Sequence, residues 1–324
     1  MGLAEQAVDG LGEIFGRHEG HRVVHAKGTL CAGTFTATPE AARLTRAPHM
    51  QGDPVEVTVR FSNASGDPEE PDGRPDGRGM ATKFYLPDGS RTDIVTVTAK
   101  RFFARTPEEF IEFNRAIAPG NGGRPRPKPL RMLWYLARNP KAAAAVRAIR
   151  EVEPIPSYAR VRFNSLHAFR WVDAAEDATH ARYSWLPEEG EATISTEEAK
   201  ALPPDYLQQD LAERLTGGRP VRFTLELQLA ADDDPLDDPR VAWPDDRERV
   251  VAGTLELTEL DTRRERGGDV LVFDPTRVTG GIELTDDPIL RFRPKAYSVS
   301  IERRGGGPPP GTDARAGAVG GEAS

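Results

Sequence analysis

The segment VRFTLELQL, residues 221–229, alternates apolar and polar side chains over its whole length. A period of two residues is that of a β-strand with one buried and one exposed face. The same alternation recurs in VVAGTLELTEL (250–260), VEVTVRFS (55–62) and TDIVTVT (92–98). It is weaker in ATKFYL (81–86) and ARYSWL (181–186). The chain is therefore expected to be built around an antiparallel sheet.

Helical periodicity appears between these strands. Apolar side chains recur every three or four residues in four segments, 3–15, 107–117, 130–150 and 205–215. The 31 Gly and 28 Pro residues are spread between the short segments, as turn residues are. The pattern predicts an α+β protein whose helices pack against an antiparallel sheet.

The composition excludes several classes of protein. The chain carries 43 Lys and Arg against 51 Asp and Glu, a formal charge of −8, whereas a nucleic-acid-binding surface needs a basic field. No apolar run approaches the roughly 20 residues of a membrane span. The first residues, MGLAEQAVDGLGEIFG, lack the basic start and apolar core of a secretory signal, which predicts a cytoplasmic protein. The one cysteine, Cys31, is expected to be a small buried side chain.

Two segments look like additions to the core. From Arg124 to Arg150 the chain has eight basic residues and no acidic one. This pattern favours a solvated helix face over a polyanion site. Residues 305–324 have almost no apolar bulk, and we expect a disordered tail there.

A cluster of histidines raises the question of a metal site. His18, His21 and His25 are three of the six histidines. In a helix His21 and His25 would share a face, but Val23 and Val24 favour extended chain, which separates the two side chains by about 13 Å. A metal ion bound by all three is not expected. The chain also contains no GxxxxGK[ST], GxGxxG, GxSxG or CxxCH motif.

A second feature lies in DDPILRFRPKAY, residues 286–297. In a helix Arg293 and Tyr297 would share a face, where a positive charge favours the phenolate. Pro294 would then have to occupy the first turn of that helix. A phenolate is one of the few protein oxygen ligands of haem iron. The alternative interpretation is a buried tyrosine hydrogen-bonded to an arginine.

Several segments taken together resemble a known family. They are RVVHAKG (22–28), VRFS (59–62), RGMATKFYLPDG (78–89), DIV (93–95), FFARTPEEF (102–110) and VFDPTRVTGGIELTDDPILRFRPKAY (272–297). In order and spacing they resemble the haem catalases. The chain length and the phrases HRVVHAKG, VRFSNASGDP, RGMATKF and PRVAWP are more closely similar to the small catalase-related haem peroxidases.

The resemblance implies a fold and a cofactor. The fold is a closed antiparallel β-barrel with packed helices, without the terminal extensions of the large catalases. Residues 1–304 would form one haem-binding domain, followed by the tail at 305–324. The cofactor would be one noncovalently bound haem b.

The resemblance also implies a role for each matching residue. His25 corresponds to the histidine on the peroxide side of the haem, Ser62 to its hydrogen-bond partner, and Tyr297 to the phenolate ligand of the iron. Arg293 corresponds to the arginine that supports the phenolate, and Asp287 to the carboxylate that orients this arginine. The remaining matches are the propionate partners Arg22, Arg60 and Arg304 and the aromatic residues around the haem, Phe102, Phe103 and Phe110.

Two positions depart from the family pattern. Counting from Asp93 puts Thr98 where large catalases hold peroxide with an asparagine, and a hydroxyl has a different reach from an amide. Ser184 falls where the large enzymes are expected to have a relay histidine behind the iron ligand, so that relay is expected to be absent.

These features predict an enzyme that reduces peroxide with small organic electron donors, with His25 as the acid–base group and weak catalase activity. One alternative is a hydroperoxide dehydratase of the allene oxide synthase type, in which a threonine precedes the histidine, whereas this chain has Val24. The other is a haem-binding protein without turnover, which has no need of His25. The expected partners are peroxide, a small reductant and a second copy of the chain in a homodimer. Nucleic acid is not expected to bind.

Overall fold

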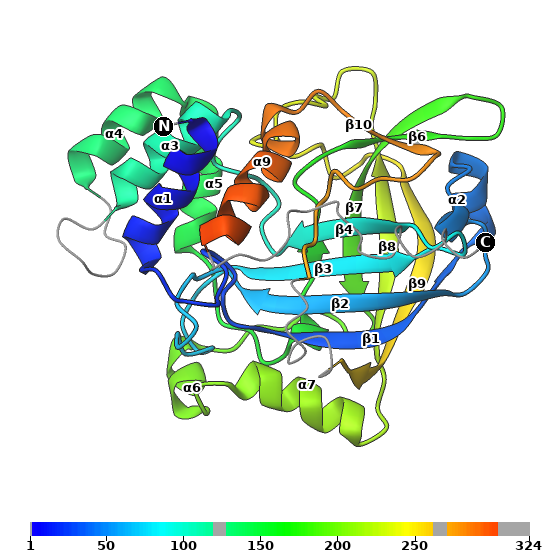
Figure 1. The fold of residues 1–324 in the computed structure, drawn as a ribbon, viewed down its shortest axis with the longest axis horizontal. Helices are drawn as coiled ribbons and strands as arrows, with labels where there is room; N and C mark the ends of the chain where they lie inside the picture. Colours follow the sequence, from blue (N-terminus) through cyan, green and yellow to red (C-terminus); the bar gives the residue numbers. More distant parts are fainter. Residues whose placement is uncertain (1, 119–127, 262–270, 304–324) are drawn as a thin grey trace, which may run out of the picture.

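Eight antiparallel strands close into a barrel in the computed structural model, which describes residues 2–118, 128–261 and 271–303 (Figure 1). Around the barrel run β1 (Gly28–Ala37), β2 (Val55–Asn63), β3 (Arg78–Tyr85), β4 (Arg91–Val97), β5 (Phe163–Asn164), β7 (Ala178–Pro187), β8 (Val221–Leu229) and β9 (Arg249–Leu260). The strand β9 pairs with β1 and closes the ring. Two short strands, β6 (Phe169–Val172) and β10 (Ile282–Leu284), extend the sheet beside β7. The predicted closed antiparallel barrel of an α+β protein is confirmed.

Large aromatic side chains fill the interior of the barrel. In β8 the alternation predicted from VRFTLELQL buries every second side chain, including Phe223 and Leu225. Phe35 meets Phe84 edge-to-face at a centroid distance of 5.3 Å and Trp185 at 5.9 Å. The barrel is thus a packed core with its large side chains inside, as expected for eight strands.

The helices lie outside the barrel in three places. One group gathers at one end of β2, β3 and β4 in Figure 1: α1 (Leu3–Phe15), α3 (Pro107–Ile117), α4 (Pro129–Arg138), α5 (Ala143–Arg150) and α9 (Pro288–Arg303). A second group, α6 (Thr196–Ala201) and α7 (Tyr206–Thr216), lies below β1 in that view, and α2 (Pro39–Leu44) lies at the far end. The site described below is built between the first group and the barrel.

The helix predicted over residues 130–150 is wrong as a single element. The structure has α4 and α5 separated by a 3-10 turn, Pro140–Ala142. Pro140 cannot donate a backbone hydrogen bond to the preceding turn, and it disfavours helical geometry at Asn139, so α4 ends there. The strand β1 was not predicted, because its Gly and Thr residues hide the alternation and a bulge shifts the register between Ala32 and Gly33.

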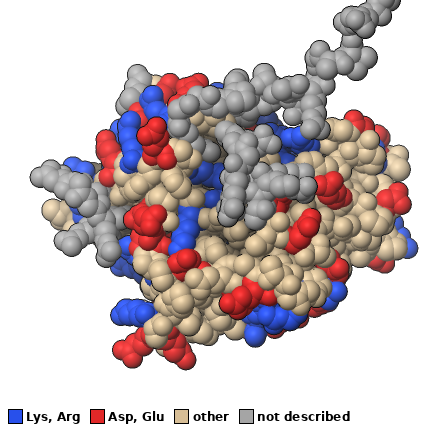
Figure 2. Space-filling model, turned by 60° about the horizontal axis from the view of Figure 1, so that its bottom comes forward, with Lys and Arg blue, Asp and Glu red and all other residues tan. Residues whose placement is uncertain are grey.

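Four smaller expectations concern the cysteine, the surface charge, membrane spans and the C-terminal tail. Cys31 is fully buried, as expected. Basic and acidic side chains are interspersed on the face shown in Figure 2. No helix among the described residues is long and apolar enough to cross a bilayer. The predicted tail, 305–324, lies outside the described residues.

Candidate functional site

A cavity of about 300 Å³ lies against the outer face of the barrel. Phe61 and Met80 belong to the barrel core, so their neighbours along β2 and β3 point outward. The outward-facing residues that form the cavity floor are Arg60, Ser62, Gly79, Ala81, Val95 and Val97. Gly79 pairs with Ser62 on one side and with Val97 on the other, so small side chains of three strands meet there.

The other walls come from the helices and from the segment before β1. Ala7 and Val8 of α1 and Ile289 and Tyr297 of α9 face the cavity. Most of the lining is apolar, and its charged members are Arg22, Arg60 and Arg293. No Asp or Glu is among the described residues that line it. The cavity is therefore apolar with a positive electrostatic bias.

His25 reaches the cavity from an irregular segment. The prediction of extended chain at this place is wrong, because His25 has a φ of 55° and β1 begins only at Gly28. The left-handed conformation is costly for a residue with a Cβ, and such strain persists only where surrounding contacts enforce it. Here the amides of His25 and Ala26 donate to the carbonyl oxygens of Ala64 and Ser65, at 3.3 and 3.0 Å.

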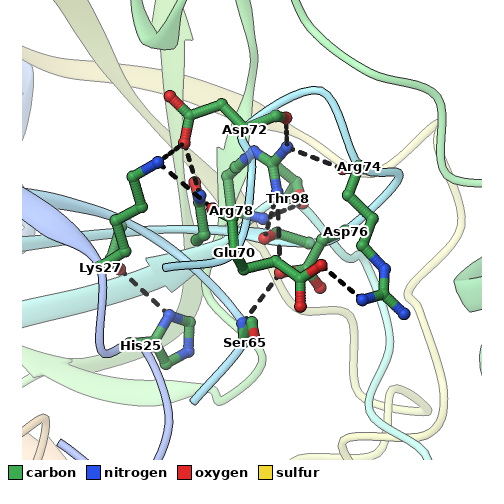
Figure 3. A network of polar contacts seen from close by, with 12 residues as sticks. His25, Lys27, Ser65, Glu70, Asp72, Arg74, Asp76, Arg78 and Thr98 are labelled. Carbon is green, nitrogen blue, oxygen red and sulfur yellow. Dashed lines mark hydrogen bonds and ion pairs between the residues drawn. The ribbon is translucent and has the colours of Figure 1, made fainter. Parts of the chain in front are cut away.

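A polar network holds the loop that supplies these carbonyl oxygens (Figure 3). Arg78 donates through its guanidinium to the carbonyl oxygens of Asp72 at 2.7 Å and Arg74 at 3.1 Å. The carboxylate of Asp76 accepts from the amide of Ser65 at 2.8 Å. Lys27 forms an ion pair of 3.0 Å with Asp72. The left-handed turn at His25 is thus fixed from both sides by buried or half-buried polar groups.

The imidazole of His25 is oriented by β2 and β3. Its Nδ1 lies 3.0 Å from Ser62 Oγ, which brings together two residues that the resemblance pairs. A Cβ on Gly79 would lie 3.0 Å from the imidazole and 2.9 Å from Ser62 Oγ. Only glycine at this position lets the ring lie against the strand. Burial, followed by the positive charges of Arg60, Arg293 and Arg22, lowers the pKa of His25 to about 3. The imidazole is therefore neutral over the physiological pH range.

Arg293 and Tyr297 share a face of α9, as predicted. Arg293 Nε donates to the phenol oxygen of Tyr297 at 2.9 Å. The condition that Pro294 sits in the first turn is wrong, because α9 begins at Pro288 and Pro294 lies inside it. Burial raises the pKa of Tyr297, and the charge of Arg293 opposes this shift. The arginine stabilises the phenolate but does not outweigh the cost of burying it.

A histidine that the sequence interpretation missed orients Arg293. His167, between β5 and β6, accepts from Arg293 Nη1 at 3.2 Å through Nε2 and contacts Asp287 Oδ2 at 2.6 Å through Nδ1. Burial lowers the pKa of His167, so the neutral ring donates from Nδ1 and accepts at Nε2. Asp287 thus contacts Arg293 through His167, which lies between them. The predicted absence of a relay behind Tyr297 is wrong, because His167 links Asp287 to Arg293. Ser184, where the prediction looked for the relay, donates to Asn164 at 3.1 Å.

Arg22 and Arg60 both line the cavity, as the resemblance implies for groups that bind carboxylates. Arg22 donates to the carbonyl oxygen of Leu271 at 2.5 Å, and Arg60 to that of Ala26 at 3.2 Å. Arg304, the third predicted partner, lies outside the described residues.

Two other predictions do not survive. Phe102 and Phe110 line the cavity. Phe103 is not among the lining residues; it lies between Phe102, at 4.3 Å between ring centroids, and Phe113 of a small second core, at 3.9 Å. Thr98 is not among the lining residues, and its hydroxyl accepts from the amide of Arg78 at 3.1 Å. The predicted contact of Thr98 with peroxide is therefore not supported by this geometry.

Comparison with known proteins assigns the chain to a family. The sequence profile of the catalase family matches residues 15–308. The chain belongs to the catalase family. This membership makes the protein an oxidoreductase that acts on peroxide.

The similarities extend over most of the chain. A catalase-related peroxidase from Mycolicibacterium paratuberculosis is 45% identical over 303 residues, which cover 93% of this chain and 95% of that protein. One from Synechococcus elongatus is 33% identical, with 93% and 88% covered. Catalase-2 of Bacillus subtilis is 29% identical, and the match covers only 44% of it. The structure of catalase A from Saccharomyces cerevisiae superposes with a TM-score of 0.78 at 23% identity, over 89% of this chain and 61% of that one, which shows the common fold.

Proteins of the catalase family bind haem, and the residues of this cavity fit that group. The cavity offers an apolar lining, one phenol oxygen of the kind that binds haem iron, and two guanidinium groups that suit carboxylates. The lack of acidic side chains among the described lining residues also suits an anionic ligand.

We expect Asp287→Ala to lower the free energy of unfolding by about 3 kcal/mol. Asp287 Oδ1 accepts from the amides of Ile289 and Leu290 at the start of α9, and Oδ2 pairs with buried His167. The matched control is Asp286→Ala, because the exposed carboxylate of Asp286 pairs with Arg291 at 2.9 Å and its loss should cost less than about 0.5 kcal/mol. Urea unfolding of the purified variants measures both. Equal losses would contradict the assigned contacts.

Proposed function

We propose that this catalase-family protein is a haem b-dependent peroxidase, which reduces hydrogen peroxide or organic hydroperoxides at the expense of small organic electron donors, with catalase turnover as a minor activity. The observation that carries the proposal is that one apolar cavity is lined both by a neutral histidine, His25, and by a tyrosine paired with an arginine, Tyr297 and Arg293.

The proposal assigns the cofactor-holding groups as follows. The phenol oxygen of Tyr297 would bind the iron, and Arg22 and Arg60 would pair with the propionates. Bound haem supplies the redox chemistry, namely two-electron reduction of the peroxide and stepwise recovery of these electrons from donors. Arg293 keeps its hydrogen bond to the phenol oxygen and thereby favours the deprotonated ligand. Asp287 and His167 hold Arg293 in that position.

His25 would move the proton that peroxide reduction requires. With Nδ1 protonated and donating to Ser62 Oγ, Nε2 is the acceptor. His25 Nε2 takes the proton of the incoming hydroperoxide and returns it to the oxygen that leaves as water or alcohol. This is general acid–base work by a group whose orientation is fixed before substrate arrives. The low pKa of His25 keeps it available as a base.

The preference for peroxidase over catalase turnover rests on the cavity wall. A catalase cycle needs a second peroxide held in position, and large catalases use an asparagine for this. None of the described lining residues is Asn or Gln, and Val97 faces the cavity next to Thr98. The extensive similarity to two catalase-related peroxidases supports the same preference.

The test of this function compares two fates of peroxide. With haem-loaded protein and o-dianisidine, we expect donor oxidation to exceed oxygen release, measured in parallel by absorbance and with an oxygen electrode. Free hemin at equal concentration is the control for protein-independent oxidation. If oxygen release is the main reaction and the donor does not affect it, the peroxidase proposal is wrong and the protein is a catalase.

Tyr297→Phe should weaken haem binding by about tenfold or more and change the ferric absorption spectrum, because no phenolate can then bind the iron. Tyr85→Phe is the matched control, since it removes a phenol hydroxyl outside the cavity that contacts Thr58 at 3.0 Å. Haem titration followed at the Soret band measures affinity and spectrum together. An unchanged spectrum in Tyr297→Phe would remove this residue as the ligand.

His25→Ala should retain haem and slow the reaction with peroxide by about 100-fold or more. Because the pKa of His25 lies near 3, protonation of this residue should not affect the wild-type rate between pH 5 and 8. Stopped-flow absorbance measures the rate, with His180→Ala, on β7 outside the cavity, as the control. Two results would contradict the assignment. One is a His25→Ala variant that reacts as fast as the wild type; the other is a wild-type rate that drops below pH 6.5 while the rate of His25→Ala does not.

A further inference from the structure

The helix α4 turns an unusually apolar face away from the protein. The three most exposed large apolar side chains among the described residues all belong to it: Leu130, Leu133 and Trp134 are 77%, 66% and 67% exposed. They are three and four residues apart and therefore lie on one side of the helix, here called the α4 face. Ile149, in the following helix α5, is 50% exposed.

The packing of α4 does not require these side chains. Its opposite side buries Met132 and Tyr135 in a small core with Phe113 of α3 and Val146 of α5. The hydroxyl of Tyr135 also donates to the carbonyl oxygen of Phe103. The helix is thus fixed to the protein through its inner side, while no described residue buries the α4 face.

The segment that carries this face is rich in basic side chains. Residues 128–150 contain six Lys and Arg and no Asp or Glu, in a chain whose net charge is −8. Three of them touch an acid: Arg138 meets Glu112 at 3.7 Å, Lys141 meets Asp238 at 3.5 Å, and Arg147 meets Glu151 at 2.8 Å. Even with these acids counted, basic groups outnumber acidic groups two to one. The cations are half exposed or more, so these pairs leave them open to further anions.

We propose that the α4 face is a docking surface for an anionic lipid bilayer, on which the protein rests without crossing it. An exposed stripe of Trp and Leu bordered by Lys and Arg has the chemistry of a helix that lies in the interface of a membrane. Tryptophan favours this depth, and each cation near the surface adds attraction to anionic headgroups. A second copy of the chain, docked through the same face, would bring its own excess of positive charge, so charge complementarity favours the bilayer.

The docking surface belongs to the helical layer that walls the cavity. Phe110 of α3 lines the cavity, and Phe113, one turn further along α3, packs against Met132 and Tyr135 of α4. Docking would therefore keep the reactive cavity within one layer of helices from the lipid. From this position the cavity could receive hydroperoxides that form in lipid acyl chains. This consequence rests on the proposed function, whereas the docking itself does not.

Tryptophan fluorescence can follow docking directly. Trp171, Trp185 and Trp243 are buried, so a change on binding reports Trp134. Vesicles of phosphatidylcholine with roughly 30% phosphatidylglycerol should shift its emission to the blue and carry the full-length protein in a flotation assay. Vesicles of pure phosphatidylcholine should bind about tenfold or more weakly, and salt should reverse the binding.

Two variants separate the apolar and basic contributions. The double variant Leu130→Gln, Leu133→Gln keeps the reporter and should lose about tenfold or more in affinity. The double variant Arg147→Gln, Arg150→Gln should weaken binding to the anionic vesicles only. Leu202→Gln, an exposed leucine 40% accessible beyond α6, is the matched control and should bind like the wild type. All these sites are exposed, so folding should be unaffected.

Absence of vesicle binding, or equal binding by the wild type and by Leu130→Gln, Leu133→Gln, would overturn the proposal. So would a wild-type dimer in light scattering that becomes monomeric in the same variant, because a second copy would then cover the α4 face. None of these readouts uses peroxide, so their failure is distinct from failure of the proposed peroxidase activity.

Discussion

The alternation of side chains along β2, β3 and β4 is the constraint on which the site depends. One set of positions sends Phe61, Met80 and Phe84 into the barrel, where they pack to the density of a core. The other set includes Ser62, Gly79 and Ala81, whose small size leaves room on the outer face. A shift of one residue in strand register would exchange the two sets, so that the barrel would lose its core and the cavity would be filled with aromatic rings. Stability and the space for a ligand are therefore set by the same register.

The reactive groups are held to this platform by polar contacts rather than by regular structure. His25 adopts a left-handed conformation that its own sequence does not favour, and the carbonyl oxygens of Ala64 and Ser65 enforce it. Those oxygens are in turn fixed by a loop that Arg78 ties together from inside. Local contacts offset the energetic cost of strain and burial, and they fix the position of the His25 imidazole before any ligand binds.

The sequence predicted the regular parts of the fold and the short-range parts of the site. Strands with strict alternation, such as 55–62 and 221–229, and the pairing of Arg293 with Tyr297 follow from local periodicity. Contacts between distant segments do not. His167 lies 120 residues from its partner Asp287, and no spacing rule connects them. Counting along the chain from Asp93 places Thr98 where large catalases have an asparagine. In the structure Thr98 follows β4, and its hydroxyl accepts from the backbone amide of Arg78. Pro294 lies inside α9 because tertiary packing outweighs its low helix propensity.

Charge balance links the two walls of the cavity. Arg60, Arg293 and Arg22 all lower the pKa of His25, yet burial is the largest cause of the shift. Carboxylates that pair with Arg22 and Arg60 would cancel part of the positive field at the imidazole and raise the pKa of His25 again. The desolvation contribution would persist, because it arises from the surrounding protein and a bound ligand would exclude still more water. His25 is thus expected to remain neutral with the cavity empty or filled, whereas burial keeps the pKa of Tyr297 raised in spite of the charge of Arg293.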